Sequence, residues 1–112
     1  MDTFNDAHLI GLVQMPKAKI IEVLNGYSVR ENLYFHRRLT ESIVGFSKRN
    51  KKLVTTQWEL VCIAEMVRRS CWKALYDDFA TQIRIKYPQI KATELKTLAR
   101  DKTERLIKKY SY

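Results

Sequence analysis

The sequence predicts an all-α protein, a compact bundle of five to six helices that forms a single domain over residues 1–112. Apolar residues recur at helical spacing along the whole chain, and no run alternates in the way of a half-buried strand. Only three glycines and two prolines interrupt the chain. A composition of 46% hydrophobic and 29% charged residues is typical of one globular domain with its own core.

The first three helices are predicted from their apolar spacing and from the residues at their ends. A short helix is expected over 6–15. A second is expected over 16–26, because proline suits a first helical turn and glycine a C-terminal cap. Ser28 and Glu31 form the pattern of a capping box, which predicts a third helix over 29–47. The residues expected on its core-facing arc are Val29, Leu33, Leu39, Ile43 and Phe46.

Three further helices are predicted in the second half of the chain. A second capping-box pattern predicts a helix over 56–69, and its apolar residues cover nearly every direction, which is typical of a buried central helix. A helix over 71–87 ends before Pro88, because the residue before a proline avoids helical geometry. Thr93 is expected to cap a last helix over 93–110. The residues expected to face inward on this helix are Leu95, Leu98, Ala99, Leu106 and Tyr110.

The net charge of +9 is concentrated in two segments. Residues 48–52 hold four cations and no carboxylate, and they are the one internal seam expected in the domain. Residues 91–112 hold seven cations against three carboxylates. Clustered cations attract phosphates, acidic protein surfaces or anionic lipid headgroups. A membrane is the weakest of these expectations, because no apolar stretch approaches the ~20 residues of a span.

Patterns for catalysis and for metal binding are missing from the sequence. Cys62 and Cys71 lack the close pairing of a structural zinc site, and we expect both to be reduced thiols. The two histidines have no second ligand at helical spacing. Asp77 and Asp78 are adjacent on a helix, so their side chains diverge by about 100° and do not converge on one substrate atom. We therefore expect no enzymatic activity, no cofactor and no bound metal.

A basic and aromatic cluster is expected on the polar side of the third helix, where Arg30, Tyr34, Arg37 and Arg38 share one sector. Two interpretations stand side by side. In the first, the arginines hold phosphates while Tyr34 stacks on a base. In the second, Arg30 stacks on Tyr34. Glu41 then pairs with Arg37 or Arg38 one turn away, and the cluster is an ordinary solvated face.

Three short segments of the second half lie at the starts of the three helices predicted there. Residues 54–59 have the sequence VTTQWE, residues 71–75 have CWKAL, and residues 93–96 have TELK, followed by Arg100. These segments resemble the openings of the three helices in a Myb/SANT-type helix-turn-helix, or in its broader MADF-like relatives, although Val54 stands where that family has its first tryptophan. The resemblance implies a three-helix half over 54–110, a basic third helix in the major groove of DNA, and a nuclear location. Some SANT-type domains bind histone tails or other proteins instead.

The two basic segments together predict a non-catalytic nucleic-acid-binding module, with DNA or chromatin favoured over RNA. The last helix is expected to lie against a groove while the basic loop clamps the phosphate backbone. This hypothesis requires Lys51 and Arg100 to lie on one docking surface. The expected nucleic-acid-binding residues are Lys48, Arg49, Lys51, Lys52, Lys96, Arg100, Lys102 and Arg105.

The alternative hypothesis is a helical protein-interaction adaptor, cellular or viral, that binds an acidic protein partner. Apolar residues left on polar faces, notably Ile85 and Ile107, favour it, because a large exposed apolar patch marks an interaction surface. Both hypotheses place the protein inside the cell. The N-terminus begins with Asp2 and Asp6 in place of the positive region of a secretory signal, so secretion is not expected.

Overall fold

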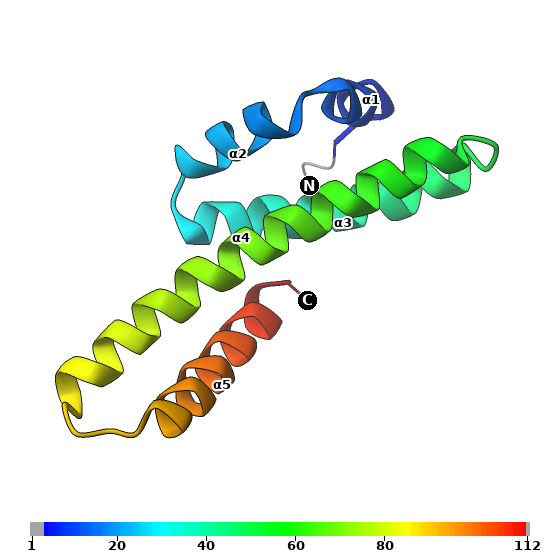
Figure 1. Ribbon diagram of the computed structural model, residues 1–112. Helices are drawn as coiled ribbons and strands as arrows, with labels where there is room; N and C mark the ends of the chain where they lie inside the picture. Colours follow the sequence, from blue (N-terminus) through cyan, green and yellow to red (C-terminus); the bar gives the residue numbers. More distant parts are fainter. Residues whose placement is uncertain (1–3, 112) are drawn as a thin grey trace.

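The chain folds into five helices (Figure 1). The computed structural model describes residues 4–111, and this part of the chain contains helices and no strand, which confirms the predicted all-α class. The helices are α1 (Asp6–Gln14), α2 (Lys17–Asn25), α3 (Val29–Arg49), α4 (Val54–Lys86) and α5 (Ala92–Ser111).

The pair α3 and α4 forms the centre of the molecule, as an antiparallel hairpin that turns at residues 50–53. Figure 1 shows α1 and α2 on one side of this pair and α5 on the other, packed along the C-terminal half of α4. The bundle is elongated, with extents of 55 × 25 × 25 Å, because α4 continues well beyond the start of α3. Its radius of gyration of 16.6 Å exceeds the roughly 13 Å of a compact domain of this length.

α4 is one continuous helix of 33 residues, so the predicted break between Arg69 and Cys71 is wrong. No glycine or proline occurs between Gly45 and Pro88, and nothing therefore interrupts the backbone hydrogen bonds of the helix. The Arg69 Nε donates to Glu65 Oε1 at 3.2 Å, an i,i+4 pair that ends at the point where the break was expected. The predicted end before Pro88 is confirmed.

The helix termini follow the local sequence signals in most places. The capping box is present, since Glu31 N donates to Ser28 Oγ at 3.2 Å and Ser28 N donates to Glu31 Oε1 at 3.1 Å. α2 lies between the proline and the glycine predicted to bound it. The capping box predicted at Thr56 is wrong, because α4 already begins at Val54. As a consequence, residues 54–110, in which the resemblance implies three helices, hold only α4 and α5.

The buried apolar residues form two clusters. The larger joins α1, α2, α3, the first half of α4 and Ile107 near the end of α5, and it contains the predicted α3 residues Leu33, Leu39, Ile43 and Phe46. The smaller lies where the second half of α4 meets α5, and it consists of Ala80, Ile83, Leu95 and Ala99. Within residues 71–87, those that pack against one of these clusters without being fully buried are Trp72, Leu75, Tyr76 and Phe79.

The inward face predicted for α5 is correct at Leu95 and Ala99, which are buried, and Leu106 is half-buried. Leu98 is exposed, because this part of α5 packs only against α4 and buries a narrow arc. Ile107, expected on the polar face, is buried because the end of α5 reaches the junction of α3 and α4. Ile85 is exposed as expected. The prediction for the Tyr110 side chain lies outside the described residues.

The first half of α4 is not buried all round, which corrects the prediction of a fully enclosed central helix. Leu60, Ile63 and Val67 are buried against α3 and α1. On another side of the helix, Trp58 is 64% exposed and Val61 is also exposed. The end of α5 reaches only as far as Val61, which lines a small hollow with Ile107 of α5 and Val44 of α3, so Trp58, nearer the start of α4, remains largely exposed.

Candidate functional site

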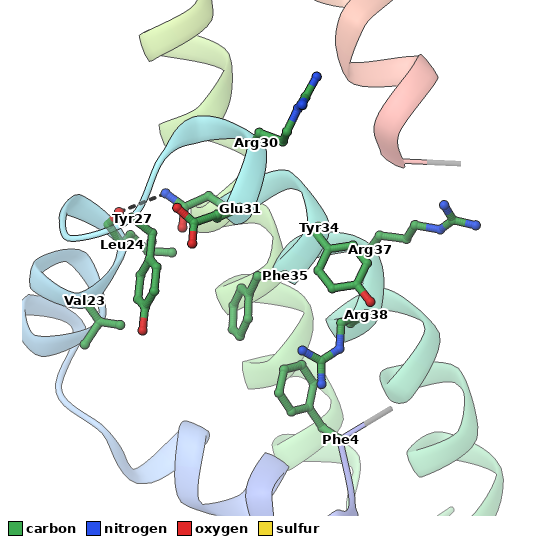
Figure 2. Close-up of a pocket in the computed structure, with 11 residues that line it drawn as sticks. Phe4, Val23, Leu24, Tyr27, Arg30, Glu31, Tyr34, Phe35, Arg37 and Arg38 are labelled. Carbon is green, nitrogen blue, oxygen red and sulfur yellow. Dashed lines mark hydrogen bonds between the residues drawn. The ribbon is translucent and has the colours of Figure 1, made fainter. Parts of the chain in front are cut away.

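A cavity of about 960 Å³ lies between α2 and the first half of α3 (Figure 2). Its lining is mainly aromatic and aliphatic on the inside and basic at the edge. The lining residues are Phe4, Val23, Leu24, Tyr27, Arg30, Glu31, Asn32, Tyr34, Phe35, Arg37 and Arg38. A concave apolar space of this size with a few polar groups at its edge is the usual form of a ligand site.

The cavity exists because α2 and α3 are joined by a tight turn and diverge from it. The buried Asn32 Nδ2 donates to the Leu24 backbone oxygen at 2.9 Å, and this hydrogen bond ties the end of α2 to the first turn of α3. Away from the turn the two helices separate, and Figure 2 shows Val23 on α2, and Tyr27 in the turn that follows it, across the open space from Phe35 on α3. Tyr27 remains exposed, so the side chain is accessible to a ligand.

The far wall of the cavity is held in place by aromatic and cationic contacts. The Phe4 and Phe35 rings meet edge to face, with centroids 5.4 Å apart. The guanidinium of Arg38 lies 4.6 Å from the centroid of Phe4 and 5.6 Å from that of Tyr34, within the range of cation–π attraction. The Phe4 backbone N–H donates to Ser42 Oγ at 2.9 Å, which fixes the N-terminal segment against α3.

The basic and aromatic cluster predicted on α3 is therefore part of a cavity wall. One of the two interpretations placed Arg30 on Tyr34; in the structure the Arg38 guanidinium lies 5.6 Å from the centroid of that ring. The predicted ion pair is present, with Arg37 Nε 3.5 Å from Glu41 Oε1. Sequence reasoning found these residues through their helical spacing. It missed the α2 residues opposite them, because the angle between two helices is set by tertiary packing.

The predicted loop of cations, residues 48–52, is divided between a helix and a turn. Lys48 and Arg49 belong to the last turn of α3, where the helix dipole favours positively charged side chains. Arg49 Nη2 donates to Asp6 Oδ1 at 2.6 Å, and Asn50 Nδ2 donates to Asp6 Oδ2 at 3.1 Å. The hydrogen bond from Arg49, followed by that from Asn50, lowers the pKa of Asp6. The expectation that this segment lacks an acidic partner is thus wrong for Arg49.

The other three loop cations, Lys48, Lys51 and Lys52, are exposed and form no ion pair with any residue that the structure describes. They lie at the tip of the α3–α4 hairpin, with no carboxylate bound to them. The tip therefore carries three unpaired cations, whereas the predicted cations of α5, which also lack an ion pair to a described residue, are spread along that helix.

The predicted cations of α5 are exposed but lie far from the hairpin tip. Lys96, Arg100, Lys102 and Arg105 all belong to this helix, and Lys102 Nζ is 6.0 Å from the Phe79 ring of α4. Phe79 follows Val54, the first residue of α4, by 25 positions. At ~1.5 Å per residue, the two basic groups are separated by roughly 35–40 Å along α4. The structure does not bring them together around one ligand-sized site.

A smaller hollow of about 330 Å³ lies where the end of α5 meets α3 and α4. Residues from the three helices line it, among them His36, Val44, Val61 and Ile107. His36 Nδ1 is buried without a hydrogen-bond partner. Burial, together with the positive charge of Arg68, lowers the pKa of His36, while the charge of Glu65 acts in the opposite direction.

Neither metal binding nor a membrane crossing has a candidate position among the residues that the structure describes. Residues 4–111 contain no group of three or more histidine, cysteine and carboxylate side chains gathered at one point. None of the helices described has both the length and the apolar character that a membrane crossing requires. Both cysteines are free thiols, Cys62 exposed and Cys71 buried.

Comparison with models of protein families, with curated proteins and with solved structures gives no match to this chain. Its function is therefore argued from the side chains and surfaces described above.

Proposed function

We propose that this protein is a helical interaction module that binds an acidic segment of another protein in the cavity between α2 and α3. The observation that carries the proposal is the composition of that cavity. Aromatic residues form its walls, and its lining includes three arginines, Arg30, Arg37 and Arg38, and a single carboxylate, Glu31. In Figure 2 the Arg38 guanidinium lies over Phe4 at the cavity wall, while the side chains of Arg30 and Arg37 extend outward from it. A ligand for such a site combines apolar side chains with negative charge.

The polar groups at the opening favour carboxylates as the charged part of the ligand. Arginine presents a planar fork of donors that matches a carboxylate in two hydrogen bonds. Glu31 is already engaged, because its Oε1 accepts from the Ser28 backbone N–H in the capping box. Arg38 is held by two aromatic rings, so part of the entropy cost of ordering a long side chain is met before the ligand arrives.

The apolar part of the ligand is argued from exposure. Tyr27, Tyr34 and Val23 remain exposed although each lines the cavity. A tyrosine at the centre of an interface contributes a large contact area at low entropy cost, and such residues dominate binding energy in many complexes. Two or three large apolar side chains of a partner segment would fill the space and bury these residues.

A direct test uses a fluorescein-labelled peptide of about 15 residues in which Phe and Leu are interspersed with Asp and Glu. Its affinity is measured by fluorescence anisotropy. We expect Tyr27→Ala to weaken binding by about tenfold, or about 1.4 kcal/mol. Tyr87→Ala is the matched control, since Tyr87 is similarly exposed but lies at the far end of α4; it should change the affinity less than twofold.

Two results would contradict the proposal. The first is equal binding of a companion peptide in which Lys replaces every Asp and Glu, because the arginines would then contribute nothing. The second is an affinity that Tyr27→Ala leaves unchanged while the variant melts like the wild-type protein.

The second candidate function is binding to nucleic acid, with DNA or chromatin as the ligand. The observation that favours it is that Lys48, Lys51 and Lys52 lack an acidic partner among the described residues. The separation between this group and the cations of α5 weakens the predicted clamp, since the two basic groups would contact phosphates independently. Of the two candidate functions, only nucleic-acid binding implies a nuclear location.

A further inference from the structure

The side of α4 that α5 covers continues, uncovered, toward the start of α4. A helix repeats its orientation after 18 residues, which make five turns of 3.6 residues. Three residues near the start of α4 therefore point in the same direction as the residues 18 positions later, which lie on the α5 side of the helix. The three early residues are Val54, Trp58 and Val61. The corresponding later residues are Trp72, Tyr76 and Phe79.

Contacts to α5 confirm the side on which the later residues lie. Trp72 Nε1 donates to Glu104 Oε1 of α5 at 2.9 Å. Tyr76 stacks on Trp72 with ring centroids 5.1 Å apart, and it packs, as Phe79 does, on the cluster between α4 and α5. The earlier three residues therefore present the same kind of surface. They are exposed because α5 ends close to Val61, where Ile107 and Lys108 line the same hollow, and does not continue over Trp58 and Val54.

α3 supplies the second wall of this uncovered surface. Val44 of α3 is exposed, and it lines the hollow of about 330 Å³ together with Val61 and with Ile107, near the end of α5. We call the surface formed by Val44, Val54, Trp58 and Val61 the open groove. It begins where α5 ends and runs toward the hairpin tip, over about 10 Å between Val54 and Val61 along the axis of α4.

The charge around the open groove differs between its two ends. Lys48, Lys51 and Lys52 stand at the hairpin tip without an ion pair to a described residue. At the other end, Glu65 lies within ion-pair distance of Arg68 and Arg69. Lys108, which lines the hollow at this end, also forms no ion pair with a described residue, so three unpaired cations lie at the tip and one at the other end.

We infer that the open groove binds an acidic amphipathic helix of a partner protein as a continuation of α5. The apolar face of that helix, two to three turns long, covers Trp58, Val61 and Val44. Its carboxylates lie toward Lys48, Lys51 and Lys52. If it runs in the direction of α5, its C-terminus faces these lysines, where the helix dipole also favours positive charge.

The charge complementarity selects a partner over a second copy of this chain. A second copy has a net charge of +9 and brings the same three lysines, so it offers little negative charge to the hairpin tip. The open groove is also separate from the cavity of the proposed function. It lies on the side of the α3–α4 pair that holds α5, whereas the cavity lies on the side that holds α2.

The experiment uses the full chain and a synthetic peptide of about 15 residues, with Leu at positions i, i+3, i+4 and i+7 and Glu elsewhere. Trp58 is a built-in reporter, because its indole is 64% exposed and becomes covered on binding. We expect a blue shift of tryptophan emission that is lost in Trp58→Phe. Val61→Glu and the pair Lys51→Glu with Lys52→Glu should each weaken binding about tenfold.

Two control variants establish that the peptide occupies the open groove and no other surface of the protein. Ile85→Glu adds a carboxylate at an exposed apolar position near the other end of α4, and it should leave the affinity within twofold of wild type. Tyr27→Ala removes the cavity residue of the proposed function and should also have no effect on this peptide. Melting curves of all variants establish that each remains folded, and Trp58→Ala replaces Val61→Glu if that variant does not.

Three outcomes overturn the inference. One is an affinity that Val61→Glu and Trp58→Ala leave unchanged. Another is equal binding of a peptide in which Lys replaces each Glu. The third is a dimer in sedimentation at micromolar concentration that Val61→Glu dissociates, because the open groove would then be occupied by a second copy.

Discussion

At the scale of single residues, the two thiols lie in opposite environments although both belong to α4. Cys62 is exposed, whereas Cys71 has only 2% of its surface exposed and packs in the larger core cluster. Burial disfavours the charged thiolate and raises the pKa of Cys71 to about 11. The sequence predicted reduced thiols but gave no basis to distinguish them, because both have apolar neighbours along the chain.

We expect one thiol of the native protein to react with a disulfide reagent such as dithionitrobenzoate at neutral pH, and two after unfolding. The fast reaction should disappear in Cys62→Ser and persist in Cys71→Ser. The number of thionitrobenzoate ions released, followed by absorbance, measures this directly. Equal reaction rates for the two native thiols would show that Cys71 is not enclosed.

His36 makes the stability of the protein depend on pH. Burial, and then the charge of Arg68, lowers its pKa below the ordinary 6.5, with Glu65 opposing. Between the folded-state pKa and 6.5 the unfolded chain binds more protons than the folded one, so the free energy of unfolding decreases as the pH falls through this window. Above 6.5 this contribution is constant.

We therefore expect the melting temperature to decrease as the pH is lowered from about 7.5 to about 5.5. His36→Gln should flatten this dependence, because the variant has no group that titrates at this position. His8→Gln serves as the control, since His8 is exposed. Thermal unfolding followed by circular dichroism at several pH values checks the prediction, and a slope that survives His36→Gln contradicts it.

At the scale of elements, the continuity of α4 determines the shape of the molecule. The same helix lines the larger core cluster in its first half and supports α5 in its second half. The sequence contains no signal that requires a break near Ser70, and the Glu65–Arg69 pair stabilises the helix just before it. At 33 residues, α4 is much longer than the mean globular helix of about 12 residues.

Ser70→Pro tests this continuity. Within an uninterrupted helix, proline removes a backbone hydrogen bond and clashes with the preceding turn, at a cost of about 3 kcal/mol or more. Ser70→Ala is the control and should stay within about 0.5 kcal/mol of wild type, since Ser70 is exposed. Urea unfolding gives both free energies. Similar stability of the two variants would indicate a helix end at this position, where proline is tolerated.

At the scale of the whole molecule, the elongated shape separates the predicted cations. The hairpin tip and Lys102 of α5 lie roughly 35–40 Å apart along α4, since Lys102 lies beside Phe79. Arg49 is also occupied by Asp6, with a nitrogen–oxygen distance of 2.6 Å. A clamp that neutralised about five phosphates on one surface would give a slope of about −4 to −5 in log K against log[salt].

With the lysines of the hairpin tip acting alone, we expect a slope of about −2 to −3 for duplex DNA. The pair Lys51→Glu with Lys52→Glu should abolish this binding, and Lys96→Glu with Arg100→Glu should leave most of it. Anisotropy of a labelled duplex at a series of salt concentrations gives the slope. A slope near −5 that both pairs reduce would restore the joint clamp and favour the nucleic-acid candidate.

Most of the local structure could be predicted from the sequence because it depends on neighbours along the chain. The Ser28–Glu31 capping box, the stop before Pro88 and the buried arc of α3 all follow from spacing and end signals. The errors concern how far helices extend past one another. Trp58 and Val61 have the spacing of core residues, and only the point at which α5 ends leaves them exposed.

The amino-acid sequence by itself determined the helical class, most helix ends and the two cationic segments, since periodicity, caps and charge are properties of short stretches. The tertiary structure decided which of these stretches meet. It placed Asp6 on Arg49, opened an aromatic cavity between α2 and α3, and kept the cations of α5 away from the hairpin tip. The physical reason is that the angle and overlap of two helices depend on the packing of side chains distant in sequence.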